Sequence, residues 1–141
     1  MKRPCITVHN RQRQLSIYRR ALQAFAEQAL PLCLQKTASG VKKFSEINVI
    51  LVSDRRMSQL HRCFMGIDGP TDVITFQHGD IFLGVETAKR QAKIYQTSVR
   101  HELRLYLVHG LLHLVGYDDH GMQARKRMER IQERIVAMAA A

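Results

Sequence analysis

Residues 101–120 read HELRLYLVHGLLHLVGYDDH, and this stretch is the most informative part of the sequence for both the fold and the functional site. Leucine and valine occupy positions all around a predicted helix over residues 98–115, which indicates a buried helix that Gly116 ends as a C′ glycine does. At about 100° per residue, four polar residues share one narrow face of this helix: Glu102, Tyr106, His109 and His113. A single polar stripe on an otherwise apolar helix predicts a functional site.

The spacing of the histidines predicts a metal site. Two imidazoles four residues apart on a helix have Cβ atoms about 5–6 Å apart, close enough for His109 and His113 to bind one cation. We expect the chain to reverse after Gly116 and to bring His120 back over the same face. Three nitrogen ligands leave a fourth position open to water, which is typical of catalytic rather than structural zinc sites. Such a site is suited to hydrolysis.

Other interpretations of the same residues remain. His109 and His113 can be core histidines whose ring nitrogens are satisfied by backbone carbonyls or by Glu102. Glu102 and Tyr106 either support the metal ligands or are ordinary polar groups of the core. Zinc proteases of the H-E-x-x-H type have a glutamate base directly after the first ligand, whereas this chain has Gly110 there. Peptide hydrolysis is therefore disfavoured.

The rest of the sequence predicts an α+β fold in a single domain over residues 1–141. Alternating or β-branched apolar segments predict four strands, at residues 5–9, 47–52, 72–76 and 80–83. Helical spacing of apolar residues predicts five helices, at residues 16–34, 53–63, 85–95, 98–115 and 122–138. Because strands and helices do not alternate strictly, we expect a small mixed four-stranded sheet covered by about five helices, one of them the metal-binding His-x-x-x-His helix.

The charge of the chain favours a polyanionic partner. The formal net charge is +10, and residues 1–43 alone carry nine basic side chains against one acidic side chain. Residues 44–120 are nearly neutral and residues 121–141 are basic again. Basic ends of this kind can hold a nucleic-acid backbone, although anionic lipid and solubility also select basic surfaces.

Cysteine content and hydropathy indicate the cellular location of the protein. Cys5, Cys33 and Cys63 are odd in number and widely spaced, which indicates reduced thiols rather than disulfides or a thiolate metal site. Lys2 and Arg3 are not followed by an apolar run, and no stretch approaches the ~20 apolar residues that a membrane span needs. We therefore expect a cytoplasmic protein without a membrane partner.

Two segments resemble the YbeY family of endoribonucleases. Residues 109–118, HGLLHLVGYD, are similar to the H-G-x-L-H-L-x-G-Y-D-H signature of that family. Residues 70–76, PTDVITF, followed by GDI at 79–81, are similar to its P-T-D-V-L-S-F and G-D-I strands. The resemblance covers about residues 46–135. It implies an α+β fold, one zinc ion per chain on three histidines, and cleavage of single-stranded RNA in ribosomal RNA maturation and quality control of the small ribosomal subunit.

The chain departs from the family pattern at the third ligand. The family has a histidine directly after Gly-Tyr-Asp, where this chain has Asp119, and the histidine follows one residue later. We predict His120 as the third ligand, because a loop absorbs one extra residue easily and an imidazole keeps the neutral three-nitrogen set. Asp119 as an oxygen ligand is the alternative.

A second departure concerns the basic residue of the family's Y-R-G-K-D segment, which aligns with residues 64–68, FMGID, and is replaced by Met65. A developing phosphoryl charge requires a cation, so either Arg62, one helical turn earlier, acts as the catalytic cation or catalysis is weak. The simpler interpretation is that Arg62 lies on a solvated helix face. Asp72 orients a ligand or caps a turn, and the basic run over residues 125–134 is most simply a salt-bridged solvated face.

The leading hypothesis is a zinc-dependent endoribonuclease that acts on ribosomal RNA and the small ribosomal subunit, with ribosome-associated proteins as further partners. Met65 favours a different class, a ribosome-assembly factor that binds RNA around a structural zinc and cleaves nothing. A metal-dependent hydrolase of another substrate is the third hypothesis, against which Gly110 argues.

Overall fold

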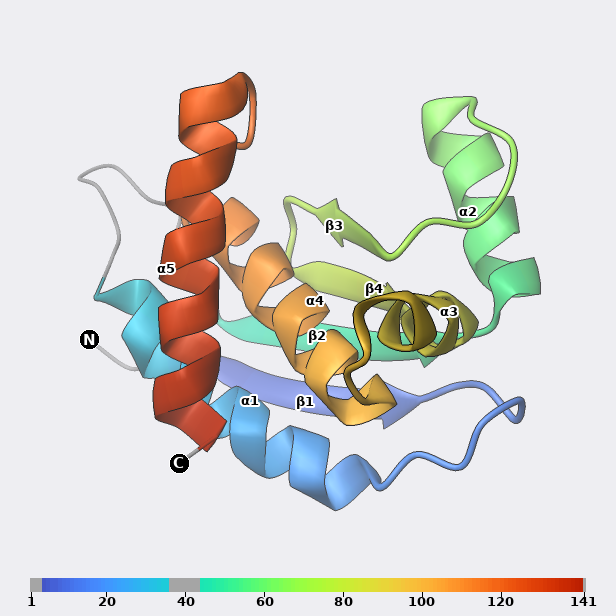
Figure 1. Ribbon diagram of the computed structural model, residues 1–141, viewed down its shortest axis with the longest axis horizontal. Helices are drawn as coiled ribbons and strands as arrows, with labels where there is room; N and C mark the ends of the chain where they lie inside the picture. The colour runs from blue at the N-terminus through green and yellow to red at the C-terminus, as the bar shows by residue number, and fades with distance from the viewer. Residues whose placement is uncertain (1–3, 36–43, 141) are drawn as a thin grey trace.

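The computed structural model describes residues 4–35 and 44–140. A four-stranded mixed sheet forms its centre, and the strands lie in the order β1-β2-β4-β3. Its strands are β1 (Cys5–Asn10), β2 (Glu46–Val52), β3 (Val73–Phe76) and β4 (Asp80–Gly84). The pairs β1–β2 and β2–β4 are parallel, whereas β3 and β4 form an antiparallel hairpin (Figure 1).

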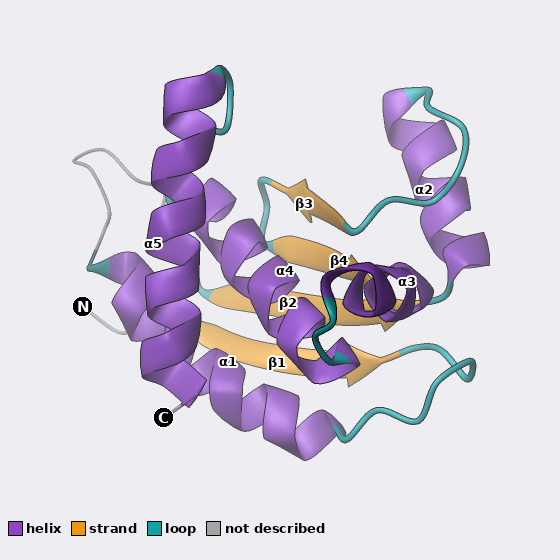
Figure 2. Ribbon diagram, in the orientation of Figure 1, coloured by secondary structure: helices purple, strands orange, loops and turns teal. Residues whose placement is uncertain are grey.

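Five helices are present in the described part of the chain (Figure 2). They are α1 (Arg19–Leu34), α2 (Asp54–Met65), α3 (Val85–Tyr95), α4 (Val99–Leu114) and α5 (Met122–Ala140). This confirms the predicted α+β class with a mixed four-stranded sheet and five helices. None of the helices in residues 4–35 and 44–140 is long and apolar enough to cross a membrane.

The first helix begins later than the sequence predicts. It starts at Arg19 rather than at Ser16, because Tyr18 has an extended backbone at the N-cap, and a local turn precedes residues 16–18. In that turn the Gln12 side chain accepts a hydrogen bond from the Leu15 N–H at 2.9 Å and donates one to the Leu15 carbonyl at 2.9 Å. Pro31 is tolerated within the helix, which continues to Leu34.

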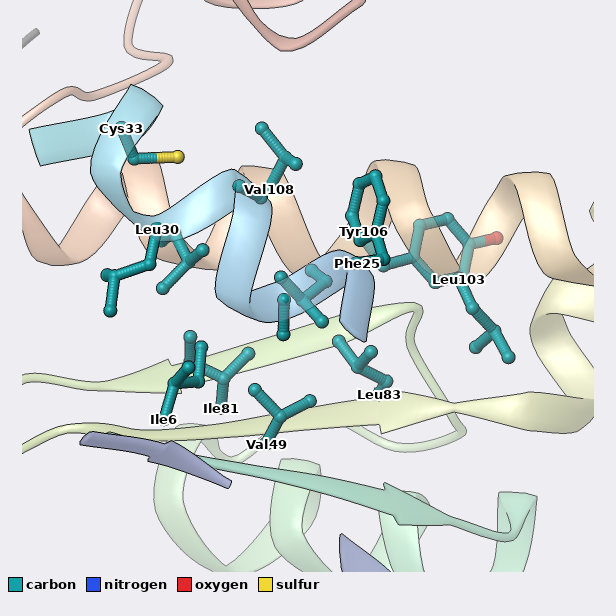
Figure 3. Close-up of a cluster of buried hydrophobic side chains, with 14 of the residues drawn as sticks. Ile6, Phe25, Leu30, Cys33, Val49, Ile81, Leu83, Leu103, Tyr106 and Val108 are labelled. Atoms are coloured by element: carbon teal, nitrogen blue, oxygen red, sulfur yellow. The ribbon is translucent and has the colours of Figure 1, made fainter. Parts of the chain in front are cut away.

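The core fills the space between the sheet and the long helices. Alternate residues of the central strands, such as Val49, Ile81 and Leu83, are fully buried, as a strand with one face on a core requires. They point toward α1 and α4, where Phe25 and Leu103 meet them (Figure 3). A smaller cluster lies under α2 and contains Val52, Met57, Leu60 and Ile74.

Gly110 explains how α4 lies so close to the sheet. A Cβ atom at this position would be 2.6 Å from Cγ2 of Ile81 and 3.3 Å from Oγ1 of Thr75. Contacts that short are not available to a side chain, so only glycine lets the helix approach the strands here. The position that carries the base in H-E-x-x-H proteases therefore faces the core in this chain, away from His109.

Candidate metal centre and its cleft

The two histidines of α4 face each other across one helical turn. Nε2 of His109 and Nε2 of His113 are 3.0 Å apart, and the ring planes are 76° apart. The other nitrogen of each ring is held from behind: Nδ1 of His109 lies 2.9 Å from Oε1 of Gln132, and Nδ1 of His113 lies 3.0 Å from the Tyr117 carbonyl. Both imidazoles are thus fixed in orientation, as ligating histidines usually are.

These partners determine which ring nitrogens carry lone pairs. Both partner atoms are oxygens that accept hydrogen bonds, so each Nδ1 donates its proton and each neutral ring has its lone pair on Nε2. The lone pairs of His109 and His113 then point at one another across 3.0 Å. Burial lowers the pKa of His113, and the neighbouring His109 lowers it further. Protonation of His113 is therefore disfavoured. The donor set fits a metal cation.

Asp119 completes the group. Oδ2 of Asp119 is 3.9 Å from Nε2 of His109, and the candidate ligand atoms of His109, His113 and Asp119 all lie within 4.8 Å of one another. All three residues are half-buried. The structure brings Asp119 rather than the predicted His120 to the two imidazoles. His120 is exposed, and its backbone N–H donates to the Asp118 carboxylate at 3.1 Å.

The turn after α4 is what brings Asp119 back. Gly116 has φ +105°, a conformation that favours glycine, and directs the chain back toward the helix. The Tyr117 N–H donates to the Leu112 carbonyl at 3.0 Å, while the Tyr117 carbonyl accepts from His113. Gly116 therefore ends the helix as predicted, and the reversal needs only three residues to present a carboxylate to His109.

A cleft of about 800 Å³ opens beside this group, between α3, α4 and α5. His109 and Asp119 line it together with Glu102 and Tyr106, two other members of the polar stripe. Carboxylates dominate its charge, because Asp72, Glu102, Asp119, Glu129 and Glu133 all line the cleft. Arg125 is the single arginine or lysine among the lining residues in the described part of the chain. Such a cleft attracts cations and repels phosphate until a cation is bound.

Comparison with known proteins identifies the family of the chain. The family model described as Endoribonuclease YbeY matches residues 7–140. The chain belongs to the YbeY endoribonuclease family. Membership confirms the predicted resemblance and, at the level of the family, the predicted enzyme class, a metal-dependent endoribonuclease.

Several YbeY proteins are similar over most of their length. The protein named Endoribonuclease YbeY from Moorella thermoacetica is 36% identical, over 87% of this chain and 85% of its own. The protein of the same name from Thermus thermophilus is 34% identical, over 84% of this chain and 92% of its own. A solution structure of a Thermotoga maritima protein is 26% identical and superposes with a TM-score of 0.67, covering 96% of this chain and 89% of that one.

Arg62 lies outside the cleft in this YbeY-family protein. Its Nε is 3.9 Å from Oδ1 of Asp68, and both side chains are highly exposed. Neither Arg62 nor Met65 lines the cleft, and the Met65 side chain is half exposed at the end of α2. The structure therefore does not bring the predicted catalytic cation together with His109.

Asp72 and two further histidines, His61 and His78, divide between the cleft and the surface. Asp72 lines the cleft, and its carboxylate accepts the Val73 N–H at 2.8 Å, so it caps the start of β3 as well. His61 contacts the Gly69 carbonyl and His78 pairs with Asp80, both as surface or loop residues. Five basic side chains of the N-terminal part lie outside the described residues: Lys2, Arg3, Lys36, Lys42 and Lys43.

Two residues of α5 were not found by sequence reasoning. Gln132 orients His109 from 23 residues away, and Arg125 supplies the positive charge of the cleft. Neither position stands out locally, because both lie within a helix face that reads as solvated and charged. Only the packing of α5 against α4 brings them to the site.

Proposed function

We propose that this protein is a zinc-dependent, single-strand-specific endoribonuclease that acts in ribosomal RNA maturation and small-subunit quality control. His109, His113 and Asp119 hold one zinc ion per chain in this proposal. The observation that carries it is the 3.0 Å approach of two Nε2 lone pairs beside a carboxylate, at the edge of a cleft, in a member of an endoribonuclease family.

The donor set supports zinc. Two imidazole nitrogens and one carboxylate oxygen, with a fourth position left for solvent, form a ligand set that catalytic zinc sites use. When bound, the ion supplies Lewis-acid activation of water and of a phosphate oxygen. Gln132 and the Tyr117 carbonyl keep both imidazoles in the tautomer that directs Nε2 toward the ion.

Arg125 takes the part in this proposal that sequence reasoning assigned to Arg62. It lines the cleft with His109 and Asp119, and its guanidinium provides the cation that a developing phosphoryl charge requires. The surrounding carboxylates of Glu129 and Glu133 limit its effect, so RNA binding in the cleft depends on the metal as well. The formal net charge of the whole chain is +10, which favours contact between its basic surface and the RNA backbone.

The expected partners follow from the family and the charge. Ribosomal RNA and the small ribosomal subunit are the proposed substrate and binding partner, with ribosome-associated proteins alongside, and the cytoplasm is the proposed location. A non-catalytic RNA-binding factor with a structural zinc is the second candidate. It is favoured by Met65 and by the pairing of Arg62 with Asp68, which leave the cleft with Arg125 as its cation.

One experiment separates these functions. The full-length protein is assayed for metal content by mass spectrometry and for cleavage of a labelled single-stranded ribosomal RNA fragment, with the same sequence in duplex form as control. We expect about one zinc per chain, cleavage of the single strand only, and loss of cleavage with a chelator and in His113→Ala. Cleavage by His113→Ala at the parent rate contradicts the proposal.

The second candidate predicts a different result from the same preparation. RNA binding that persists in the metal-loaded protein without any cleavage selects the assembly factor. His120→Ala is the matched control, because this exposed imidazole lies outside the three-residue group and its loss should leave both metal content and cleavage unchanged.

A further inference from the structure

The part of the cleft around Tyr106 has unused hydrogen-bonding capacity. The Tyr106 side chain is 7% exposed, and its buried hydroxyl has no hydrogen-bond partner among the residues that the structure describes. A buried hydroxyl without a partner costs about 1–3 kcal/mol, so native proteins rarely leave one unless a ligand or a water completes it. Tyr106 lines the cleft, so a ligand that moves aside the groups covering the hydroxyl can bond to it.

Glu102 provides acceptors at the same place. Its side chain is only 5% exposed, and Oε2 accepts a hydrogen bond from Oγ1 of Thr97 at 2.7 Å. A carboxylate has about four acceptor sites, and the Thr97 bond, the one hydrogen bond to this carboxylate in residues 4–35 and 44–140, leaves most of them available. A buried carboxylate that lines a cleft is therefore matched to a ligand that presents several N–H donors.

The surroundings of Tyr106 fix its role as a donor. Burial raises the pKa of the Tyr106 hydroxyl, and the nearby carboxylates of Asp72 and Glu102 raise it further. The hydroxyl therefore stays protonated and can donate a hydrogen bond to a ligand acceptor. Tyr95 also lines the cleft with a side chain that is 66% exposed, and an exposed aromatic ring is a surface on which a nucleobase can stack.

We propose that Glu102, Tyr106 and Tyr95 form a pocket for a guanine base of the single-stranded RNA substrate, which we call the Glu102 pocket. In this pocket the N1–H and the exocyclic amine of guanine donate to the Glu102 carboxylate, Tyr106 donates to O6, and the base stacks on Tyr95. The inference rests on the proposed function for its substrate class, and it adds the base that the cleft selects.

The carboxylate is what makes guanine the match. Of the four RNA bases, only guanine has two adjacent N–H donors on its Watson–Crick edge, with a carbonyl beside them for Tyr106. Adenine and cytosine present a ring-nitrogen acceptor next to their amine, and uracil has one N–H between two carbonyls. Each of these directs an acceptor toward Glu102, and polar groups left without partners at a buried site discriminate strongly.

Nucleotide binding to the zinc-loaded full-length protein tests the pocket. Affinities for GMP, IMP, AMP, CMP and UMP are measured by calorimetry, and the shared phosphate makes the metal contribution common to all five. We expect GMP to bind at least about tenfold more tightly than AMP, CMP or UMP. IMP, which lacks the exocyclic amine, should lie between. Equal affinities for the five nucleotides overturn the inference.

Matched variants identify the residues. Glu102→Gln keeps an acceptor for Thr97 but replaces one oxygen by a donor, so the preference for GMP should fall to within about twofold of AMP. Tyr106→Phe removes one oxygen and should weaken GMP binding several-fold while leaving UMP unchanged. Glu129→Gln removes the same charge from another carboxylate of the cleft and should keep the preference. Thermal unfolding verifies that each variant is folded, and an unchanged preference in folded Glu102→Gln and Tyr106→Phe excludes the pocket.

The outcomes separate this inference from the proposed function. Metal-dependent RNA cleavage without any nucleotide preference supports the proposed nuclease activity and contradicts the Glu102 pocket. Preferential GMP binding without RNA cleavage supports the Glu102 pocket and contradicts the proposed nuclease activity. Because a guanidinium also presents paired N–H donors, binding of N-acetylarginine amide is measured in the same way. Binding of this compound, with no binding of GMP, assigns the site to a cationic peptide and overturns the guanine inference.

Discussion

Nε2 of His109 lies 3.0 Å from Nε2 of His113, while the opposite nitrogen of each ring contacts an oxygen acceptor. Two neutral imidazoles held in this way repel each other through their lone pairs unless a cation lies between them. The fold supports this arrangement from two directions, since Gln132 comes from α5 and the Tyr117 carbonyl from the turn after α4. The site is therefore prepared for metal by the protein itself.

Asp119 and His120 should differ sharply in their contribution to metal binding. We expect Asp119→Ala to lower zinc affinity by at least about tenfold, because it removes a candidate ligand, and His120→Ala to change it by less than about twofold. Competition with a chromogenic chelator measures both. A larger loss in His120→Ala would restore the three-histidine set that the family resemblance implies.

Gln132 should be needed for tight metal binding although it is not a candidate ligand. Its Oε1 fixes the tautomer and orientation of His109. Loss of such a supporting hydrogen bond typically lowers metal affinity about 10–100-fold, and we expect a loss in that range for Gln132→Ala. Gln123→Ala, an exposed glutamine on the same helix, is the control. Equal affinities of the two variants would contradict the role of Gln132.

The stability of the metal-free protein should fall at acidic pH through His113. Burial and His109 lower the pKa of His113 in the folded state, so the stabilisation is complete above the unfolded pKa of about 6.5 and is lost as the pH falls through the folded value. Urea unfolding in the presence of chelator, between about pH 7.5 and pH 5.5, measures the effect. His113→Asn should show a shallower decline than the parent protein, and parallel curves would exclude His113 as its source.

Gly110→Ala should destabilise the fold by about 1–3 kcal/mol, because the added methyl group overlaps Ile81 and forces α4 away from β4. Chemical denaturation measures the loss. In an Ile81→Ala background, Gly110→Ala should lower the free energy of unfolding by less, since the shorter side chain leaves space for the added methyl group. Equal costs in the two backgrounds would mean that the contact with Ile81 is not the cause.

Local sequence patterns were sufficient for most of the fold. Ser53 accepts a hydrogen bond from the Arg56 N–H and begins α2, as a serine before a helix predicts. The β3–β4 hairpin and the end of α4 at Gly116 likewise follow from short-range signals. The start of α1 was predicted three residues too early, because residues 16–18 are not helical and Tyr18 has an extended backbone at the N-cap. The periodicity of apolar residues alone does not distinguish these two structures.

The sequence by itself determined that His109 and His113 share a helix face, because a spacing of four residues is a property of the helix and needs no other contact. It did not determine the third member of the group, since Asp119 and His120 are neighbours and the direction of each side chain depends on how the turn packs. Gln132, Arg125 and the unpaired Tyr106 hydroxyl were likewise decided by tertiary structure. Gln132 and Arg125 come to the site only because α5 packs against α4, and no local pattern encodes such a long-range contact.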